Sequence, residues 1–459
     1  MYKIDFENPV RIHFIGIGGI SMSGLAAILL DRGFPVSGSD RAESELTVWL
    51  EQSGAKIFYG QRASNIEDGI GVVVYTAAIH PDNPEYAAAV SAGIPMLTRA
   101  ELLGQLMTNY QLPIAISGTH GKTTTTSMVS HILLAQDADP TISVGGILPA
   151  IGGNIRVGGS RYFVTEACEY TNSFLDFFPK ISLILNIDAD HLDFFKDLDD
   201  IRHSFRLFAQ KLPEDGILII NSAIPDVEEI TRDLSCRVVY YGEGPLASYH
   251  AENIVYDEHA CGSFDLVRDN EVLGRYELKV PGSHNIDNAV ASLTLGHLLE
   301  IPEETLRQGL LEFTGTDRRF QHKGEIGGVT VIDDYAHHPT EITATLNAAK
   351  QCPHNTLWCV FQPHTYTRTK ALMDDFAKAL ALADKVVLAD IYAARETDTL
   401  GISSRTLQEH ILTLGTDAYY FPSFDEIETF LLEKCVQGDL LITMGAGDIV
   451  KVGEKLLGK

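Results

Sequence analysis

The stretch PIAISGTHGKTTTT, residues 113–126, decides how the middle of this chain folds. Its apolar start, Pro113–Ile116, is typical of a buried strand, and a glycine-rich turn then leads into a helix through Met128, Ile132 and Leu133. In such a turn, successive backbone N–H groups point inward and the helix dipole adds partial positive charge. The stretch therefore predicts a strand, a loop that cradles phosphate groups, and a helix.

The residue types in this loop suit a nucleoside triphosphate. We expect Lys122 to reach the β- and γ-phosphates of ATP and the Thr123 hydroxyl to ligate Mg²⁺. The loop is compact, because two residues separate Gly118 from Gly121 where the common P-loop has four. A glycine turn before a threonine-capped helix is the plainer alternative, but the preceding strand and the spacing favour phosphate binding. The predicted ATP-binding set of the loop is Gly118, Thr119, His120, Gly121, Lys122, Thr123 and Thr124.

Two later apolar runs end in polar residues that would face this loop. In RYFVTEACEY, residues 161–170, Glu166 ends a strand, and a carboxylate there suits magnesium, which prefers oxygen ligands. In SLILNIDADHLDFF, residues 182–195, we expect His191 to contact a metal or phosphate from a loop with several aspartates. Strand-end acids and single histidines are usually structural, but a neighbouring phosphate loop favours function. The predicted metal set is Thr123, Glu166 and His191.

A second glycine loop lies near the N-terminus, in FIGIGGISMSGLA, residues 14–26. Gly16 and Gly18 follow a strand and precede a helix, as in a dinucleotide fingerprint, although the third glycine of that fingerprint falls on Ser21. Asp40 ends the next strand and could bond a ribose hydroxyl. Alone, this loop would suggest NAD and a dehydrogenase. Two nucleotide-type loops in one chain indicate two different nucleotides.

The chain divides into three α/β units. Residues 9–106 alternate apolar runs with helical stretches, one of which places Met22, Leu25, Ala26 and Leu29 on one face. Residues 113–315 continue the alternation but become strand-rich at 247–280, where a turn is expected at 269–270. Alternation resumes after Gly324, and such alternation predicts parallel sheets. The expected domains are residues 1–108, 109–316 and 317–459, Rossmann-like at both ends, with a central P-loop ATPase domain that carries added antiparallel strands.

Composition sets limits on partners and location. The 459 residues carry a formal net charge of −27, which argues against nucleic acid or an anionic membrane as partner. No apolar run reaches the length of a membrane span, and no signal segment opens the chain, so we expect a cytoplasmic protein without membrane insertion. The six cysteines are scattered, which predicts reduced thiols rather than disulfides or a zinc site.

Nine motifs in order make this chain resemble the Mur ligases, which build the peptidoglycan precursor. The matching stretches are GIGGISMSGLA, GTHGKTTTT, TEACEYTNSFL, NIDADHLDFF, PGSHNIDNAVAS, DRRF, DDYAHHPTE, FQPHTYTRT and MGAGDI. The resemblance implies an N-terminal domain that binds a UDP-linked substrate, a central ATPase domain, and a C-terminal domain that binds the amino acid and part of ATP. A P-loop switch or motor, the remaining alternative, would have no need for UDP-type recognition.

The resemblance also assigns residues outside the phosphate loop. His284 and Asn288 would contact the nucleotide, Arg319 a phosphate across the domain gap, and Asp334 the ATP ribose. Plainer alternatives are helix capping for the first two and a solvated surface pair for Arg318–Arg319. The implied catalytic set is Lys122, Glu166, His191, Arg319 and His337. The implied substrate set is Gly16, Gly18, Gly19, Ser21, Met22, Ser23, Asp40, Thr76, His337 and Arg368, the last of these pairing with the amino-acid carboxylate.

Within the family, the motifs favour the branch that joins L-alanine to the carboxylate of UDP-N-acetylmuramate through an acyl phosphate, with ATP and Mg²⁺. A ligase that adds a whole peptide, or another amino acid, to the same sugar is the alternative. Thr365 stands where some members carry arginine. Arg206 stands at the offset where ligases for acidic or dibasic residues carry a carbamylated lysine, and arginine cannot be modified in that way. We expect a monomer or homodimer.

Overall fold

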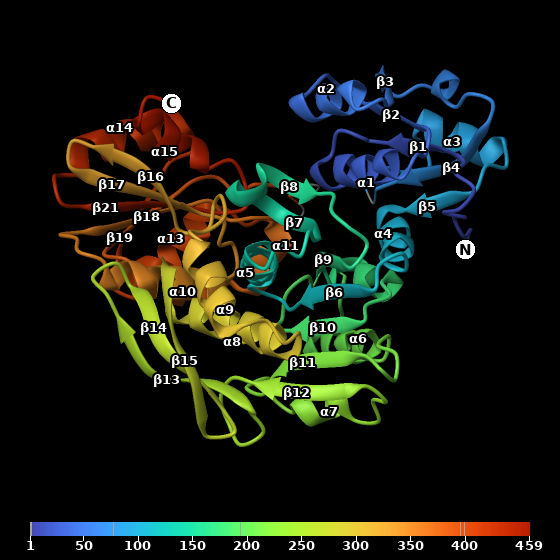
Figure 1. Cartoon of the computed structure of the whole chain (residues 1–459). Helices are drawn as coiled ribbons and strands as arrows, with labels where there is room; N and C mark the ends of the chain where they lie inside the picture. Colours follow the sequence, from blue (N-terminus) through green and yellow to red (C-terminus); the bar gives the residue numbers. More distant parts are fainter. Residues whose placement is uncertain (1, 77, 193, 395, 399) are drawn as a thin grey trace.

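A computed structural model describes residues 2–76, 78–192, 194–394, 396–398 and 400–459 of the chain. Three sheets follow one another along the sequence, and helices flank each of them (Figure 1). We call the parts built on these sheets the N-terminal, middle and C-terminal units. The predicted α/β class with three such units is confirmed, whereas the domain boundaries stay a prediction.

The N-terminal unit has a five-stranded parallel sheet in the order β3-β2-β1-β4-β5. This order reverses direction at β1, so the loop after β1 lies at a switch point where ligands bind in such sheets. The strands are β1 (Arg11–Ile15), β2 (Val36–Asp40), β3 (Lys56–Tyr59), β4 (Ile70–Tyr75) and β5 (Met96–Thr98). The helices are α1 (Ile20–Asp31), α2 (Glu45–Gln52), η1 (Ala63–Asn65), α3 (Pro84–Ser91) and α4 (Arg99–Met107).

The middle unit has a ten-stranded mixed sheet in the order β15-β14-β13-β12-β11-β10-β6-β9-β7-β8. Its strands are β6 (Leu112–Ser117), β7 (Thr141–Leu148), β8 (Gly153–Arg156), β9 (Tyr162–Ala167), β10 (Ile181–Ile184), β11 (Ile217–Asn221), β12 (Arg237–Tyr241), β13 (Tyr249–Tyr256), β14 (Cys261–Arg268) and β15 (Glu271–Pro281). Its helices are α5 (Lys122–Ala135), η2 (Pro149–Ile151), η3 (Tyr170–Asp176), α6 (Leu198–Ala209), α7 (Val227–Thr231), α8 (Ser283–Leu298) and α9 (Glu303–Glu312).

The strand-rich stretch adds the antiparallel meander β13-β14-β15 to this sheet, as the sequence predicts, and β8 at the other edge is also antiparallel, to β7. The expected turn between β14 and β15 is confirmed, because Arg268 pairs with Glu271 across Asp269 and Asn270. Both turn residues have positive φ, 48° and 72°, which a tight two-residue hairpin turn requires and which aspartate and asparagine tolerate.

The C-terminal unit has a six-stranded sheet in the order β16-β17-β21-β18-β19-β20, parallel except for β16. Its strands are β16 (Gln321–Ile326), β17 (Val329–Asp334), β18 (Leu357–Phe361), β19 (Lys385–Leu388), β20 (Asp417–Tyr420) and β21 (Leu440–Met444). Its helices are α10 (Pro339–Gln351), α11 (Tyr366–Ala371), α12 (Met373–Leu380), α13 (Ser404–Thr413), α14 (Phe424–Lys434) and α15 (Val450–Leu456).

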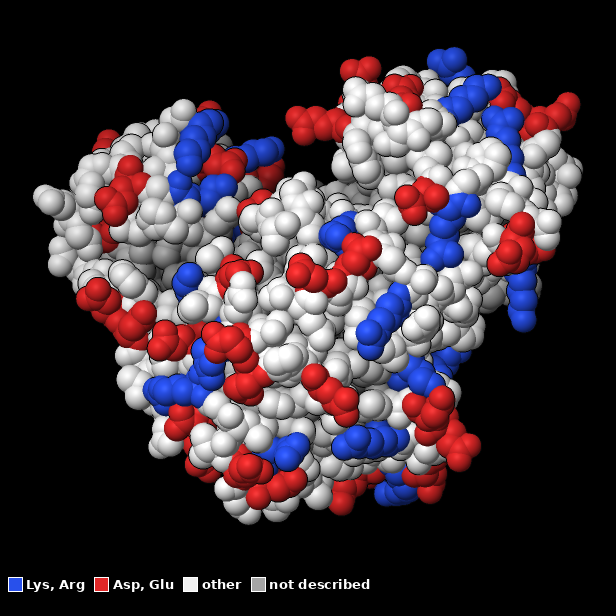
Figure 2. Space-filling model, in the orientation of Figure 1, with Lys and Arg blue, Asp and Glu red and all other residues white. Residues whose placement is uncertain are grey.

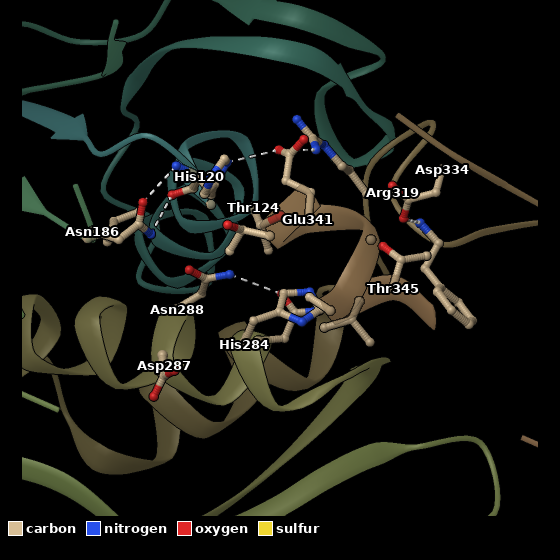
Figure 3. A pocket seen from close by; sticks show the side chains of 18 of the residues that line it. His120, Thr124, Asn186, His284, Asp287, Asn288, Arg319, Asp334, Glu341 and Thr345 are labelled. Atoms are coloured by element: carbon tan, nitrogen blue, oxygen red, sulfur yellow. Dashed lines mark hydrogen bonds and ion pairs between the residues drawn. The ribbon is translucent and has the colours of Figure 1, made fainter. Parts of the chain in front are cut away.

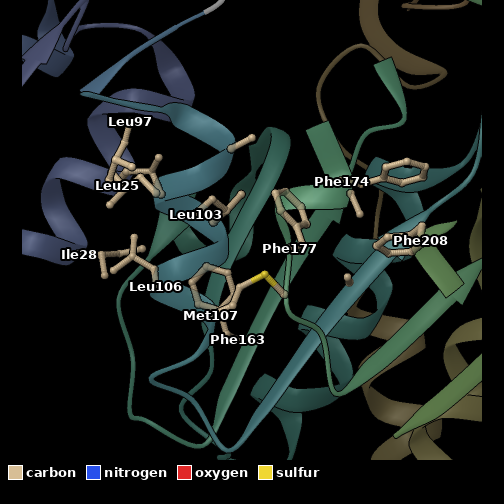
Figure 4. Packing of buried hydrophobic residues seen from close by; sticks show 14 of the residues in the cluster. Leu25, Ile28, Leu97, Leu103, Leu106, Met107, Phe163, Phe174, Phe177 and Phe208 are labelled. Atoms are coloured by element: carbon tan, nitrogen blue, oxygen red, sulfur yellow. The ribbon is translucent and has the colours of Figure 1, made fainter. Parts of the chain in front are cut away.

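The N-terminal and middle units share one apolar core. Leu103, Leu106 and Met107 of α4 pack toward Phe163 and Phe177 of the middle unit (Figure 4). Helix α4 approaches the middle unit so closely at Gly104 that an added Cβ would lie 1.9 Å from the Asp176 carbonyl oxygen. Burying large side chains of this kind stabilises a contact by about 1.5–3 kcal/mol each, so this joint is a firm one.

Charges are mixed on the surface rather than gathered by sign. Figure 2 shows acidic and basic side chains interspersed over the visible face, with a notch between the N-terminal and C-terminal units. The net negative charge therefore does not define a single acidic face on this side. The six cysteines are free thiols, as predicted. Among the described residues, no helix combines the length and apolar character that a membrane crossing needs.

Candidate active site

The predicted phosphate loop joins β6, which ends at Ser117, to α5, which begins at Lys122. Gly118 and Gly121 have φ of 142° and 84°, in a region that disfavours residues with a side chain. A Cβ on Gly121 would also lie 2.6 Å from the Asn288 Oδ1 atom, and one on Gly118 would touch Leu185. Backbone conformation and close packing therefore both require glycine at these two positions.

The loop is clamped by Asn186, which the sequence analysis did not single out. The backbone N–H of His120 donates to Asn186 Oδ1 at 2.8 Å, and Asn186 Nδ2 donates to the His120 carbonyl at 3.0 Å. In addition, the Asp188 N–H donates to the Thr119 hydroxyl oxygen at 2.9 Å. The loop after β10 thus fixes the shape of the phosphate loop. The NIDADH motif contains this asparagine, but the sequence pattern led to a functional prediction only for its histidine.

Lys122 is not free in the loop. Its Nζ atom donates to the carbonyl oxygens of Gly118 at 2.5 Å and Thr119 at 3.1 Å, and to Glu169 Oε2 at 3.0 Å. Burial alone would lower the pKa of Lys122, but the Glu169 carboxylate raises that pKa above its ordinary value. The ammonium therefore stays charged, and contact with a phosphate requires it to give up at least one of these three partners.

Glu169 is the second functional candidate that sequence reasoning missed. Its side chain is 2% exposed, and its Oε1 atom has no hydrogen-bond partner among the described residues. That oxygen lies 3.8 Å from His191 Nε2, so Glu169 stands between the lysine and the histidine. Glu166 could be predicted because it ends a strand. Glu169 follows after the strand has ended, where no periodicity indicates the direction of a side chain.

Thr123 and Glu166 offer oxygen donors for a metal ion. Glu166 Oε1 accepts a hydrogen bond from the Gly145 N–H at 2.5 Å, and a Cβ on Gly146 would lie 3.3 Å from Thr123 Cγ2. The glycine pair of β7 therefore contacts both side chains, and a hydroxyl with a carboxylate is the donor chemistry that magnesium prefers. The described residues contain no group of three His, Cys, Asp or Glu side chains that could hold a metal by themselves.

A cavity of about 220 Å³, here called the loop pocket, lies between the phosphate loop and the C-terminal unit (Figure 3). Helix α8 supplies His284 and Asn288, and the Thr125 hydroxyl donates to Asn288 Oδ1 at 3.2 Å. Neither residue caps α8, because the N-cap is Gly282, no side chain makes a capping hydrogen bond, and both residues lie within the helix. Further lining residues are His120, Thr124, Asn186, Asp188, Arg319, Asp334, Glu341 and Thr345.

The two neighbouring arginines have different surroundings. Arg318 donates to Asp333 Oδ2 at 2.9 Å and to the carbonyl oxygen of Gly445 at 2.7 Å, so it holds the C-terminal unit together. Arg319 instead lines the loop pocket, and its Nη1 atom lies 3.6 Å from Glu341 Oε1 (Figure 3). The plain alternative of a solvated surface pair does not apply to either.

Asp334 also lines the loop pocket, but its carboxylate already accepts two hydrogen bonds. The donors are the N–H groups of Phe320 at 2.8 Å and Ala336 at 2.7 Å. Burial raises the pKa of Asp334 to about 6, despite the nearby Arg319. A ribose contact would therefore add to an existing hydrogen-bond network, and it stays a prediction.

A second cavity of about 360 Å³, here called the arginine pocket, surrounds Arg368. The guanidinium donates through Nε and Nη2 to Asp190 Oδ1 at 3.0 and 2.9 Å, and its Nη1 lies 3.1 Å from His364 Nδ1. Burial would raise the pKa of Asp190, but Arg368 holds that pKa well below its usual range. An incoming carboxylate would thus share Arg368 with Asp190. The other lining residues include His191, Tyr335, His337, Thr365, Leu372 and Glu396.

Three non-glycine residues of the arginine pocket have left-handed backbone conformations. They are His191, Thr365 and Ala394, with φ of 54°, 64° and 52°. A β-branched residue such as threonine is a clear outlier there, and such strain gathers at functional sites. Burial lowers the pKa of His337 in the same pocket to about 4, so its imidazole is neutral near pH 7.

The loop pocket and the arginine pocket adjoin. In the segment 188–191, Asp188 lines the loop pocket and the next three residues line the arginine pocket. Likewise, Asp334 lines the loop pocket and Tyr335 lines the arginine pocket. His338 Nε2 lies 3.2 Å from the Ala189 carbonyl oxygen and so ties the two segments together. The middle and C-terminal units therefore bring most of the predicted catalytic residues to one interface.

The N-terminal glycine loop is built more simply. The Gly18 N–H donates to Asp40 Oδ2 at 2.8 Å and the Arg41 N–H to Asp40 Oδ1 at 2.7 Å, so the carboxylate braces the loop. Gly16 has φ of 84° and Gly19 is the N-cap of α1. The Ser21 hydroxyl accepts a hydrogen bond from Arg99.

Not every predicted substrate residue has an exposed surface in this loop. Met22 is fully buried in the core and Ser23 is 1% exposed, so the Met22 side chain packs in the core, and the substrate contacts of both residues stay a prediction. Thr76 follows β4, where its hydroxyl accepts a hydrogen bond from Ala78 at 3.3 Å.

Arg206 stands at the offset from His191 where related ligases carry a carbamylated lysine, and in this chain it contacts a neighbouring helix. It points from α6 toward α7, where Nη1 donates to the Glu229 carbonyl oxygen at 2.9 Å. The preceding residue, Phe205, is fully buried against Phe174. Arg206 is therefore a surface contact between two helices.

Comparisons with known proteins agree with this architecture. Residues 11–111 match the Mur ligase family catalytic domain, residues 116–296 the Mur ligase middle domain, and residues 318–447 the Mur ligase glutamate ligase domain. The chain is 61% identical to UDP-N-acetylmuramate–L-alanine ligase of Agathobacter rectalis over 459 residues, the full length of both.

Solved structures give the same result. A UDP-N-acetylmuramate-alanine ligase from Thermotoga maritima aligns with a TM-score of 0.80 at 30% identity, and a murein peptide ligase from Psychrobacter arcticus with 0.71 at 24% identity. Each alignment covers 98% of both chains, and the second shows likeness of fold only. This protein is an enzyme of the Mur ligase family.

Proposed function

We propose that this enzyme uses ATP to form an amide between the carboxylate of UDP-N-acetylmuramate and the amine of L-alanine, in peptidoglycan precursor synthesis. The relatives with the highest identity given above carry this activity in their names. The structural observation that best supports this proposal is the pair of adjoining pockets. One lies beside a phosphate loop and the other around a buried arginine, and two loops contribute to both.

The chemistry requires activation of the sugar carboxylate. A carboxylate oxygen attacks the γ-phosphorus of ATP, ADP leaves, and an acyl phosphate forms. The neutral alanine amine then attacks the acyl carbon, inorganic phosphate leaves, and the nitrogen gives up one proton to solvent or a base, so that the amide keeps one N–H. Lys122 and Arg319 would neutralise charge on the transferred group, and Asn186 would keep the phosphate loop in shape.

The residues present fit a magnesium ion beside the phosphate loop. Thr123 and Glu166 would hold it, since both are oxygen donors that the β7 glycine pair brings close. Bound there, the ion would neutralise phosphate charge and orient the terminal phosphate. His191 stays a predicted contributor from the far side of Glu169.

The amino acid is assigned to the arginine pocket. Arg368 would pair with the alanine carboxylate while keeping Asp190 as a partner. His337, neutral near pH 7, would lie by the amine and could accept a proton from it. Leu192, Ala371 and Leu372 give the pocket an apolar wall suited to a small side chain. The UDP moiety would bind the N-terminal glycine loop, from which the sugar acid reaches the middle unit.

Phosphate release tests this proposal. The enzyme would be given ATP, magnesium and UDP-N-acetylmuramate, with each of the twenty amino acids and a tripeptide in turn. We expect release that depends on both the sugar nucleotide and L-alanine. Turnover only with the tripeptide would instead assign a recycling ligase, and no release with any acceptor would reject the ligase assignment. Cytoplasmic location, a monomeric or dimeric state and the domain boundaries 1–108, 109–316 and 317–459 remain part of the proposal.

A further inference from the structure

Glu341, in the first turn of α10, touches residues of both pockets. Its Oε1 atom lies 3.4 Å from His120 Nδ1 and 3.6 Å from Arg319 Nη1, on the side of the loop pocket (Figure 3). Its Oε2 atom accepts a hydrogen bond from the His337 N–H at 3.1 Å and lies 3.3 Å from His337 Nδ1. One carboxylate thus holds two cations of the loop pocket and one imidazole of the arginine pocket.

The link reaches into the phosphate loop itself. His120 lies in the phosphate loop of the middle unit and contacts Glu341 of the C-terminal unit with one ring nitrogen, while the other, Nε2, lies 3.1 Å from Asp188 Oδ2 of its own unit. Its backbone is the segment that Asn186 clamps. A change at Glu341 therefore alters the position of the His120 ring in the loop that is predicted to bind phosphate, while Asn186 holds the His120 backbone in place.

On the basis of the function proposed above, we propose that Glu341 is a positioning residue that couples the two pockets, so that nucleotide in the loop pocket and amino acid in the arginine pocket favour each other's binding.

The physical reason is competition for a shared carboxylate. Phosphate oxygens in the loop pocket would draw Arg319 and His120 away from Glu341 Oε1. Glu341 would then be left to its remaining contact, His337, and would hold that imidazole in one orientation. The effect is reciprocal, because a ligand that holds His337 against Glu341 weakens the hold of Glu341 on Arg319 and His120, which are then free to contact phosphate.

Charge and burial fit this role. The Glu341 side chain is 12% exposed, and burial alone would raise its pKa, but His337, His120 and Arg319 hold the pKa of Glu341 well below its ordinary value. Burial would likewise lower the pKa of His120, yet Asp188 and Glu341 raise it to about 9. Near pH 7 this is a charged carboxylate facing a charged imidazole with little screening by water, and such pairs are strongly coupled.

The test is a binding cycle with the whole enzyme. The Kd of a non-hydrolysable β,γ-imido analogue of ATP would be measured by calorimetry at saturating UDP-N-acetylmuramate, with and without saturating L-alanine. We expect L-alanine to tighten nucleotide binding at least fivefold in the unmodified enzyme and by less than twofold in Glu341→Gln. Glutamine keeps the size and the hydrogen bond from the His337 N–H but removes the charge.

Two further variants serve as a control for the loss of charge and as a second test of the contact between Glu341 and His120. Glu409→Gln neutralises an exposed carboxylate on α13 of the same unit and should keep the full coupling. His120→Gln breaks the link from the other end and should lose it, which serves if Glu341→Gln fails to fold. Coupling absent from the unmodified enzyme, or retained in both Glu341→Gln and His120→Gln, would overturn the proposal. Phosphate release by the unmodified enzyme tests the proposed function separately, so the two can fail independently.

Discussion

The chain contains two glycine loops that join a parallel strand to a helix, and they are built differently. In the N-terminal loop, the glycine turn itself is braced by one carboxylate, Asp40, and by the backbone of Ser39, while Arg99 contacts only Ser21 at the start of α1. The loop of the middle unit is held by side chains from three other segments, through Asn186, Glu169 and Glu341. The same strand, glycine turn and helix thus form a loop with few side-chain contacts in the N-terminal unit and a loop held by several side chains in the middle unit.

The difference suits the two proposed tasks. A loop that only binds a diphosphate needs backbone N–H groups and a helix N-terminus, and few side chains. A loop that must neutralise a phosphoryl group in transfer needs charges held ready in a fixed place. The cross-linking also implies that substitutions in the middle loop affect stability as well as turnover, whereas those in the N-terminal loop affect binding alone.

Lys122→Ala should have the largest effect. We expect turnover to fall at least a hundredfold, because loss of one transition-state donor typically costs about 3–4 kcal/mol. We also expect the melting temperature to fall, since Glu169 is left buried without its partner. Steady-state phosphate release and thermal unfolding measure the two effects.

The double variant Lys122→Ala with Glu169→Gln separates these effects. Removing the stranded charge should restore most of the melting temperature but none of the turnover. Lys434→Ala, an exposed lysine on α14, is the matched control. Turnover near normal in Lys122→Ala would contradict the role given to the lysine.

Glu169→Gln alone should lower turnover about tenfold. Without the carboxylate, Lys122 keeps only its two carbonyl partners and is held less firmly at the phosphate loop. Because the lysine itself remains, the loss should be smaller than in Lys122→Ala. Phosphate release is the measurement, with Glu214→Gln, an exposed site of the same unit, as control. An unchanged rate would show that Glu169 serves packing only.

The sequence allowed the strands, the two loops and the strand-end residues to be predicted, because these follow from local pattern. An apolar run, a glycine turn and a helix lie within twenty residues in each case, and parallel strands bring their ends to one edge. Even Met22 fits this view. Its helical periodicity placed it on the apolar face with Leu25, and burial agrees with that pattern rather than with the fingerprint.

The functional candidates that could not be predicted are instead brought to the site by contacts between segments far apart in the sequence. Glu169 lies 47 positions from Lys122, and Asn186 lies 66 from His120. Glu341 meets His120 across the interface of two units. No periodicity connects such pairs, since only the packed fold brings them together. Arg206 likewise shows that an offset along the sequence does not give the direction of a side chain, since its guanidinium contacts the Glu229 carbonyl oxygen.

Asp40→Ala tests the N-terminal side of the comparison. We expect the KM for UDP-N-acetylmuramate to rise about tenfold, a free-energy change of roughly 1.4 kcal/mol, because the loop loses the carboxylate that fixes the Gly18 N–H. The KM for ATP and the melting temperature should stay close to normal. Asp68→Ala, an exposed site of the same unit, should change none of these values. A rise in the ATP value instead would place the UDP moiety elsewhere.

The smallest expected effect is a change in the pH dependence of the melting temperature, which should occur for the middle loop and not for the N-terminal loop. Because the pKa of His120 is raised to about 9 from an ordinary 6.5, protonation of this residue stabilises the folded chain. That contribution is complete below pH 6.5 and disappears as the pH rises through about 9. The unmodified enzyme should therefore melt about 2–4 °C above His120→Asn at pH 6.5, with the gap closing by pH 10. In the N-terminal loop, Asp40→Ala should keep a melting temperature close to normal at both pH values, because that loop is also held by backbone hydrogen bonds to Ser39. A constant difference for His120→Asn would mean that the imidazole acts by packing, and the middle loop would then be no more dependent on charge than the N-terminal one.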